Sequence, residues 1–289
     1  MFLGTTTAVL LGLLLHSTAG VWAKPRDTSK VLSIGVVLFP GFQPLDVVGP
    51  LDMIFLLSGG QNMTLSTIWR ETGPIWARAP ELAHPEAAPP PAEGTLPSTY
   101  PLVGPHIVAT HTFSNAPKLD ILLVPGGGGN VVLSENNDTV IEDFLVARFD
   151  ELEYLISVCT GAVSLAKSGL LKGRNATTSK YAWSWVTQFG HGVKWTPNAR
   201  WVEDGKVWTS SGVSSGLDMT YALFKKILGE KAVDVVVNAM EYTPHQNRHW
   251  DAFAVVHKVP GADTTRPLGD CVGPVGYDFK CARDIGKVH

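Results

Sequence analysis

Segments typical of buried strands alternate with segments of helical periodicity along most of the chain. The strand segments are nearly continuous runs of β-branched and other apolar residues, as expected for strands covered on both faces. We predict strands at 31–39, 65–70 and 106–110, within 119–130, at the start of 154–173 and at 206–210. We predict helices within 44–58 after Pro50, at 139–149, in the later part of 154–173, and at 179–189, 214–229 and 231–242. This alternation predicts an α/β fold with a mostly parallel sheet and helices on both faces.

These elements are predicted to form one domain at 24–245. Residues 77–105 interrupt it with a segment rich in Pro, Ala and Glu that lacks the apolar side chains of a core, so we interpret it as a surface insertion. Residues 246–289 follow the last predicted helix and are expected to form an irregular tail.

Residues 1–23 have the pattern of a secretory signal peptide. An apolar stretch ends at the small residue Ala23 before a polar segment, which predicts cleavage there and a secreted protein. The apolar core is shorter than the roughly 20 residues that span a bilayer. The chain is 45% hydrophobic and 17% charged with a net charge of −3, and it has no long run of one sign. We therefore expect neither a nucleic-acid partner nor a membrane partner.

Three Asn-X-Thr sequons agree with export. They begin at Asn62, Asn137 and Asn175, and such tripeptides are acceptors for N-linked glycans. Asn62 and Asn137 have turn-like neighbours, where a glycan can project into solvent. Asn175 starts a predicted strand close to the candidate site, which argues against a glycan there.

The chain has three cysteines. In an oxidising compartment Cys271 and Cys281 can close a short loop in the tail, which leaves Cys159 unpaired. An unpaired cysteine in a secreted protein is either buried as a small hydrophobic residue or reactive.

Cys159 lies where a predicted strand meets the following helix. A side chain at such a turn points out at the edge of the sheet, beside the first N–H groups of the helix, whose partial positive charge favours a thiolate. The Val-Cys-Thr-Gly-Ala string resembles a nucleophile elbow, with small residues where the backbone turns tightly. Cys159 is therefore the candidate nucleophile, and Thr160 follows it directly.

Two further features are expected at the same edge of the sheet. The strand within 119–130 ends in four glycines, whose N–H groups can approach a ligand closely, so Gly127 and Gly128 are candidates for an oxyanion or phosphate site. No Lys-Ser/Thr follows, which excludes a nucleotide P-loop. Asp46 follows the first strand among apolar residues, where a carboxyl must be hydrogen-bonded or protonated, or caps a helix. We find no metal-ligand cluster and expect no metal site.

Three strings carry a family resemblance. They are FPGFQPLDVVGPLD at 39–52, LDILLVPGGGG at 119–129 and SVCTGAVSLAKSGLLKGRNATT at 157–178. In this order they resemble the ThiJ/PfpI superfamily, and within it the isonitrile hydratases, over roughly residues 31–245. The resemblance implies a flavodoxin-like sandwich, a homodimer, a small-molecule substrate and no cofactor.

The resemblance also implies a role for each matched position. Cys159 is the nucleophile, Asp46 is the proton shuttle beside its sulfur, and Thr160 with the loop around Gly127 binds the substrate or a developing charge. The family commonly has a histidine after the Ala-Thr-Thr string, whereas Ser179 stands there in this chain. This difference argues against a Cys-His protease or amidotransferase and removes one polar contact expected of some hydratases.

The activity implied by the resemblance is hydration of an isocyanide to an N-substituted formamide through a thioimidate on Cys159. One alternative is a glyoxalase or deglycase that acts on 2-oxoaldehydes with the same cysteine. Another is a non-catalytic secreted redox or binding protein in which Cys159 is oxidised. Replacing Asp46 abolishes turnover under the enzyme hypotheses and leaves binding or oxidation largely intact under the last.

Overall fold

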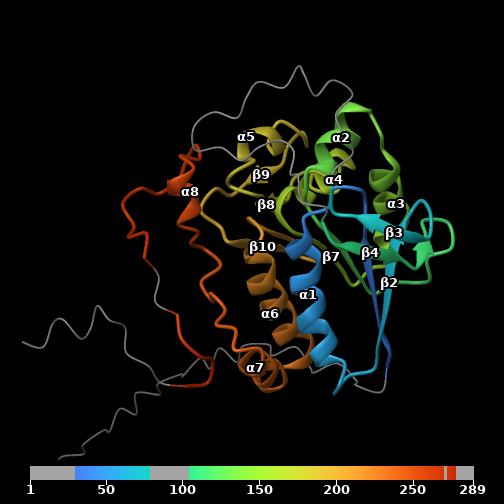
Figure 1. Cartoon of the computed structure of the whole chain (residues 1–289). Coiled ribbons are helices and arrows are strands. Elements are labelled where there is room, and N and C mark those ends of the chain that lie inside the picture. The colour runs from blue at the N-terminus through green and yellow to red at the C-terminus, as the bar shows by residue number, and fades with distance from the viewer. Residues whose placement is uncertain (1–29, 79–103, 270–271, 278–289) are drawn as a thin grey trace, which may run out of the picture.

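The computed structural model describes residues 30–78, 104–269 and 272–277 (Figure 1). The predicted signal peptide, most of the Pro-rich insertion, and both Cys271 and Cys281 lie outside these residues. In the described part of the chain, no helix is long and apolar enough to cross a membrane.

A seven-stranded sheet forms the centre of the described structure, in the order β10-β11-β7-β6-β1-β2-β5. Its strands are β1 (Leu32–Val37), β2 (Met63–Trp69), β5 (His111–Thr112), β6 (Ile121–Val124), β7 (Tyr154–Ser157), β10 (Trp201–Asp204) and β11 (Val207–Ser210). All neighbouring strands are parallel except β10 and β11, which are antiparallel. The mostly parallel α/β fold predicted from the sequence is confirmed.

Helices cover both faces of this sheet. The helices are α1 (Pro44–Leu57), α2 (Gly129–Glu135), α3 (Val140–Arg148), α4 (Ala162–Lys167), α5 (Trp183–Val186), α6 (Ser215–Leu228), α7 (Glu230–Ala239) and α8 (Phe253–Val256), with short 3₁₀ turns at Phe149–Glu151 and Cys159–Gly161. Helices α1, α6 and α7 pack together on one face, and α3 and α4 pack together on the other (Figure 1).

The strand order places a topological switch point at the centre of the sheet. The chain leaves β1 toward β2 on one side, and later returns to β6 on the other side of β1. The loops that follow β1 and β6 therefore diverge, and the crevice between them is where open α/β sheets bind ligands. Strand β7 lies next to β6, so the residues after β1, β6 and β7 meet at one edge.

Three local predictions from the sequence were wrong or incomplete, and some elements were not predicted. The first helix begins at Pro44, because a proline at the first helical position needs no N–H partner, and it continues through Pro50. The helix expected at 179–189 is reduced to α5. Strand β10 and helix α2 were not predicted. The 106–110 segment forms β4 (His106–Ala109), which pairs with β3 (Gly73–Trp76) in a hairpin outside the main sheet.

The described part of the tail docks onto the domain. It is largely irregular apart from α8, but Trp250 is buried, and Ala254 and Val259 pack with Trp183. Asp218 of α6 is fully buried and accepts hydrogen bonds from Arg200 Nε, the Tyr242 hydroxyl and the His245 amide. A buried charge needs such partners, so this carboxylate joins the edge of the sheet, α6 and the segment after α7. Two other isolated strands, β8 (Asn175–Ala176) and β9 (Lys194–Trp195), pair with each other.

Candidate active site

Cys159 lies at a strained turn directly after β7. Its φ is +58°, a left-handed conformation that costs a non-glycine residue about 1–3 kcal/mol. The turn is held by hydrogen bonds from the Cys159 amide to the Ser211 carbonyl at 2.9 Å and from the Gly161 amide to the Val158 carbonyl at 2.9 Å. A Cβ on Gly161 would lie 2.3 Å from the Val124 carbonyl oxygen, so only glycine fits there. Cys159 thus lies at a tight turn between β7 and α4, where its side chain is buried.

Asp46 is fully buried in the first turn of α1 and lies beside the thiol of Cys159. Its Oδ2 accepts a hydrogen bond from the Gly126 amide at 2.8 Å, and its Oδ1 accepts no hydrogen bond from the described residues. Burial raises the pKa of this carboxyl to about 7, against the lowering effects of the Gly126 amide and of the Cys159 thiol. The N-cap of α1 is Gln43, and no side chain caps this helix, so Asp46 has no capping role.

The thiol of Cys159 is not acidic at rest. Burial raises its pKa, the nearby Asp46 carboxylate raises it further, and the Ser179 hydroxyl and the Thr160 amide and hydroxyl act in the opposite direction. The thiolate expected from the helix N-terminus is therefore not the resting form. The Asp46 carboxyl is the titratable group beside the sulfur.

The glycine loop positions the site rather than forming an open anion pocket. The Gly126 amide is used by Asp46, and the Gly127 amide donates to the Thr160 hydroxyl oxygen at 2.9 Å. Gly127 has a φ of +142°, and a Cβ there would lie 2.2 Å from the Gly41 carbonyl oxygen. No hydrogen bond among the described residues joins Gly128 to Cys159, Asp46 or Thr160. The Gly127 amide is thus committed to Thr160, and an oxyanion role for Gly127 and Gly128 stays a prediction.

Comparisons with known proteins show the family of the chain. The chain is 30% identical over 218 residues to isonitrile hydratase from Pseudomonas putida. The aligned region covers 74% of this chain and 79% of that protein. The model of the DJ-1/PfpI family matches residues 102–226. The chain belongs to the DJ-1/PfpI family. Protein DJ-1alpha of Drosophila melanogaster is 25% identical over 125 residues, which cover 43% of the chain and 55% of that protein.

Solved structures of the DJ-1/PfpI family share the fold. A ThiJ/PfpI family protein from Pseudomonas syringae superposes with a TM-score of 0.56 at 22% identity, covering 83% of each chain. DJ-1beta of Drosophila melanogaster gives a TM-score of 0.54 at 18% identity, covering 74% of this chain and 99% of its own. At these identities the likeness concerns the flavodoxin-like fold alone.

Three polar residues near the nucleophile were not assigned a site role from the sequence. The Thr178 hydroxyl donates to the Cys159 carbonyl at 2.8 Å, and the Ser179 hydroxyl acts to lower the pKa of the Cys159 thiol. Asn130 Oδ1 accepts a hydrogen bond from the Thr160 hydroxyl at 2.9 Å, while Asn130 Nδ2 has no partner among the described residues. Among the described residues, no cluster of acidic, histidine or cysteine side chains is arranged to hold a metal ion.

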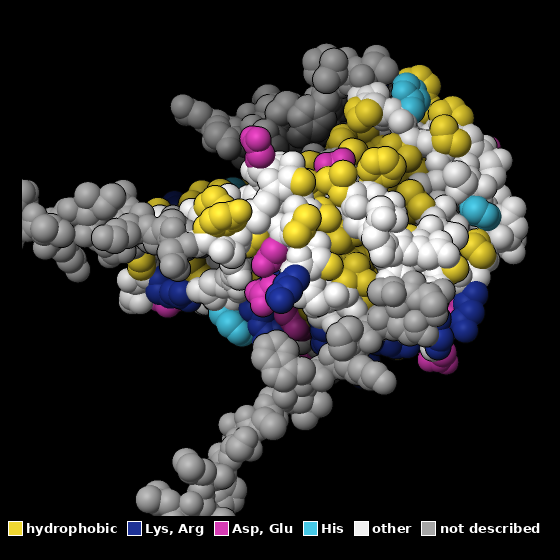
Figure 2. Space-filling model, turned by 90° about the horizontal axis from the view of Figure 1, so that it is seen from below, with side chains coloured by type: hydrophobic (Ala, Val, Ile, Leu, Met, Phe, Trp, Pro, Cys, Tyr) yellow, Lys and Arg dark blue, Asp and Glu magenta, His cyan; other side chains and the backbone are white. Residues whose placement is uncertain are grey.

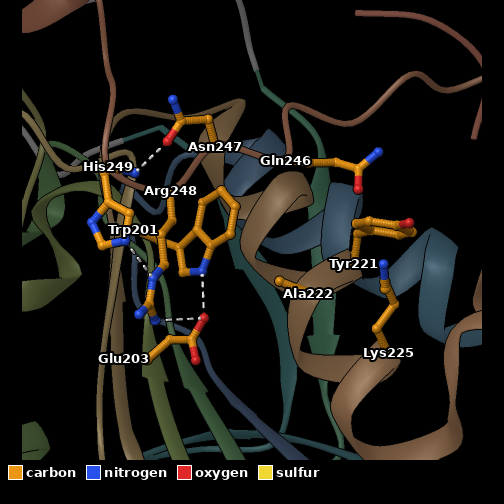
Figure 3. A pocket seen from close by; sticks show the side chains of 9 residues that line it. All are labelled: Trp201, Glu203, Tyr221, Ala222, Lys225, Gln246, Asn247, Arg248 and His249. Carbon is orange, nitrogen blue, oxygen red and sulfur yellow. Dashed lines mark hydrogen bonds and ion pairs between the residues drawn. The ribbon is translucent and has the colours of Figure 1, made fainter. Parts of the chain in front are cut away.

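A pocket of about 350 Å³ lies away from the elbow, between β10, α6 and residues 246–249 (Figure 3). It is lined by Trp201, Glu203, Tyr221, Ala222, Lys225, Gln246, Asn247, Arg248 and His249. Its charged groups are already paired, since Arg248 binds Glu203 at 3.0 Å and Lys225 binds Glu230 at 2.5 Å. It contains none of the groups around Cys159, and we assign the chemistry to the elbow.

Proposed function

We propose that this member of the DJ-1/PfpI family hydrates an isocyanide, R–N≡C, to the formamide R–NH–CHO, with Cys159 as nucleophile and Asp46 as proton shuttle. The observation that carries the proposal is the buried Asp46 carboxyl beside the thiol, with one uncommitted oxygen and a pKa of about 7. Such a group takes and returns a proton near neutral pH. The similarity to an isonitrile hydratase supports the choice of substrate.

In the first half of the reaction, Asp46 takes the thiol proton as the sulfur attacks the terminal carbon. The sulfur electron pair forms the C–S bond, and a lone pair remains on the carbon. That carbon then takes the proton from Asp46, which gives the thioimidate R–N=CH–S–Cys159 and restores the carboxylate.

In the second half, Asp46 removes a proton from a water molecule, and the oxygen of that water adds to the thioimidate carbon. The C=N π pair moves to nitrogen, which takes the proton from Asp46. The added hydroxyl then forms the carbonyl as the C–S bond breaks, and its proton passes through Asp46 to the leaving sulfur. The products are R–NH–CHO and the original thiol, so the net reaction consumes one water.

The state of the glycine loop favours this chemistry over acyl transfer. A hydrolase that forms an oxyanion needs free N–H donors aimed at it, whereas the Gly126 and Gly127 amides are both engaged with side chains. Attack on an isocyanide places the charge on carbon, where a proton donor is needed instead. Asp46 supplies that proton.

Formation of the formamide from p-nitrophenyl isocyanide tests the proposal. We expect turnover by the reduced wild-type protein and none by Cys159→Ala, with both proteins equally folded by circular dichroism. If the folded, reduced wild type leaves the isocyanide unchanged, the hydratase proposal fails. Methylglyoxal is then the substrate to test for the 2-oxoaldehyde alternative.

We also propose that the chain is exported and glycosylated. The support is the apolar segment before Ala23, together with sequons whose asparagines Asn62, Asn137 and Asn175 are all exposed. The pairing of Cys271 with Cys281 belongs to the same proposal. Export would place Cys159 in an oxidising compartment, where its burial limits reaction with other thiols.

We further propose that the chain forms a homodimer. Apolar side chains are exposed on α1, among them Val48 and Phe55, which are 46% and 73% exposed. Figure 2 shows apolar side chains gathered among neutral ones on the face seen from below. A second copy of the chain would bury such groups, and sedimentation velocity of the wild type against Phe55→Glu tests this assignment.

A further inference from the structure

Asn130 is a buried asparagine at the start of α2, directly after the glycine loop. It is 2% exposed, its Oδ1 accepts a hydrogen bond from the Thr160 hydroxyl at 2.9 Å, and its Nδ2 has no partner among the described residues. A buried amide with an unpaired N–H is destabilising. An apolar residue of similar volume would avoid this cost, so asparagine at this position is explained by the hydrogen bond that its oxygen accepts.

That hydrogen bond fixes the direction of the Thr160 proton. A hydroxyl has one proton and two lone pairs. The Gly127 amide can only donate, and it lies 2.9 Å from the Thr160 hydroxyl oxygen. The Thr160 oxygen therefore accepts from Gly127 with a lone pair, while its proton goes to Asn130 Oδ1. Without an acceptor at position 130, the hydroxyl would be free to rotate away from this arrangement.

The same part of the glycine loop holds Asp46. The Gly126 amide donates to Asp46 Oδ2 at 2.8 Å, and the next amide along the chain is the one that donates to Thr160. Both side chains pack against the same glycine, since a Cβ on Gly126 would lie 2.5 Å from Thr160 Oγ1 and 3.0 Å from Asp46 Oδ2. Two consecutive amides thus link the Thr160 hydroxyl to the Asp46 carboxyl. Rotation of that hydroxyl weakens the support of the amide that binds Asp46.

We propose that Asn130 is a positioning residue whose side-chain oxygen holds the Thr160 hydroxyl as the acceptor of the Gly127 amide and thereby keeps the Gly126 amide on Asp46 Oδ2. With Oδ2 occupied, Oδ1 is the carboxylate oxygen left for the proton of Cys159. The use of that proton in turnover rests on the proposed function, whereas the effect of Asn130 on the Asp46 carboxyl does not.

The test is the titration of the Asp46 carboxyl, followed by carbon-13 NMR of protein labelled at aspartate, with Asp46→Asn to identify the signal. Asn130→Leu removes the amide at similar volume and keeps the bond from the backbone amide of residue 130 to the Gly127 carbonyl, which is 3.1 Å long. The Gly126 hydrogen bond lowers the pKa of Asp46, which is about 7, so a weaker bond raises that pKa. We expect the midpoint in Asn130→Leu to rise by about one pH unit. The control Asn136→Leu, at the exposed end of the same helix, should titrate as the wild type.

A double-variant cycle tests whether Asn130 acts through Thr160. Thr160→Val removes the hydroxyl and should raise the Asp46 midpoint by a similar amount. Adding Asn130→Leu to Thr160→Val should then change nothing further, because the proton that Asn130 accepts is already gone. In a Thr160→Ser background, which keeps a hydroxyl, Asn130→Leu should again raise the midpoint. Circular dichroism and thermal unfolding check that each variant is folded.

The outcomes separate this inference from a packing effect and from the proposed function. An unchanged Asp46 titration in folded Asn130→Leu overturns the inference, as do shifts that add in the double variant or an equal shift in Asn136→Leu. If Asn130→Leu does not fold, Asn130→Ala adds no apolar branch and is read by the same criteria. A raised midpoint in a protein that does not hydrate p-nitrophenyl isocyanide upholds the inference and rejects the hydratase proposal alone.

Discussion

The thiol of Cys159 lowers the pKa of the Asp46 carboxyl, while the carboxylate of Asp46 raises the pKa of the Cys159 thiol. Both effects favour the form in which the proton is on sulfur and the carboxyl is ionised. The two groups therefore titrate as a coupled pair. Under the proposed function this pair exchanges one proton, and its coupling determines how the site should respond to substitution.

Replacing the carboxyl separates turnover from thiol reactivity. We expect Asp46→Asn to reduce kcat/KM for p-nitrophenyl isocyanide about 10²–10⁴-fold, the usual contribution of a proton-transfer group. The same variant should alkylate faster at neutral pH, because the neighbouring negative charge is gone and the pKa of the thiol falls. Steady-state kinetics and iodoacetamide labelling measure the two effects.

Asp52→Asn is the matched control for that variant, since Asp52 is exposed on the same helix. It should change neither quantity. Slower alkylation by Asp46→Asn would contradict the electrostatic account of the pair, whatever happens to turnover.

The activity should depend on pH through Asp46. The carboxylate is the form that accepts the thiol proton, and its pKa is about 7. The value of kcat/KM should therefore rise as the pH increases through about 7 and be small below it. A profile that is flat from pH 5 to 8 in a stable protein would remove Asp46 from the role of base.

Stability should depend on the same group in the opposite sense. The pKa of Asp46 is raised from 3.8 in the unfolded chain to about 7 in the folded one, so the folded state binds the proton more tightly. Its contribution to stability is present at low pH and is lost as the pH rises toward 7. Relative to Asp46→Asn, the wild type should therefore become less stable over this range, as urea unfolding at several pH values can show.

Much of this site follows from the sequence because its main parts are local. The run of apolar residues before Cys159 and the small residues after it predict the elbow, and parallel strands bring Asp46 and the glycine loop to the same edge. The contacts of Asn130 and Thr178 do not follow in this way. Each is a hydrogen bond between loops that are far apart in sequence, and no periodicity records such a bond.

The glycine loop predicts a steric test. A Cβ on Gly126 would lie 2.5 Å from the Thr160 hydroxyl oxygen and 3.0 Å from Asp46 Oδ2. Gly126→Ala should displace both side chains, reduce stability by about 1–3 kcal/mol and abolish turnover. In Gly212→Ala the added methyl meets no atom within 4 Å, so its melting temperature should match the wild type. Equal loss in both variants would argue against the close approach.

Glycan occupancy should differ among the sequons of protein secreted from a eukaryotic host. Asn62 and Asn137 are exposed, whereas Asn175 donates to the Asp204 carboxylate at 3.2 Å and its sequon threonine, Thr177, is fully buried. Glycopeptide mapping should find glycans at the first two sites, which Thr64→Ala and Thr139→Ala remove. An occupied Asn175 in folded protein would contradict the expectation.

The left-handed backbone at Cys159 costs stability at the same residue that carries the proposed nucleophile. Glycine adopts that conformation without strain, so Cys159→Gly relieves the backbone as it removes the sulfur. A sequence selected for stability alone would have glycine instead of cysteine at this turn. The protein keeps cysteine in a conformation that the fold must hold in place. The rigidity of the surrounding loops is therefore needed to keep the sulfur in position.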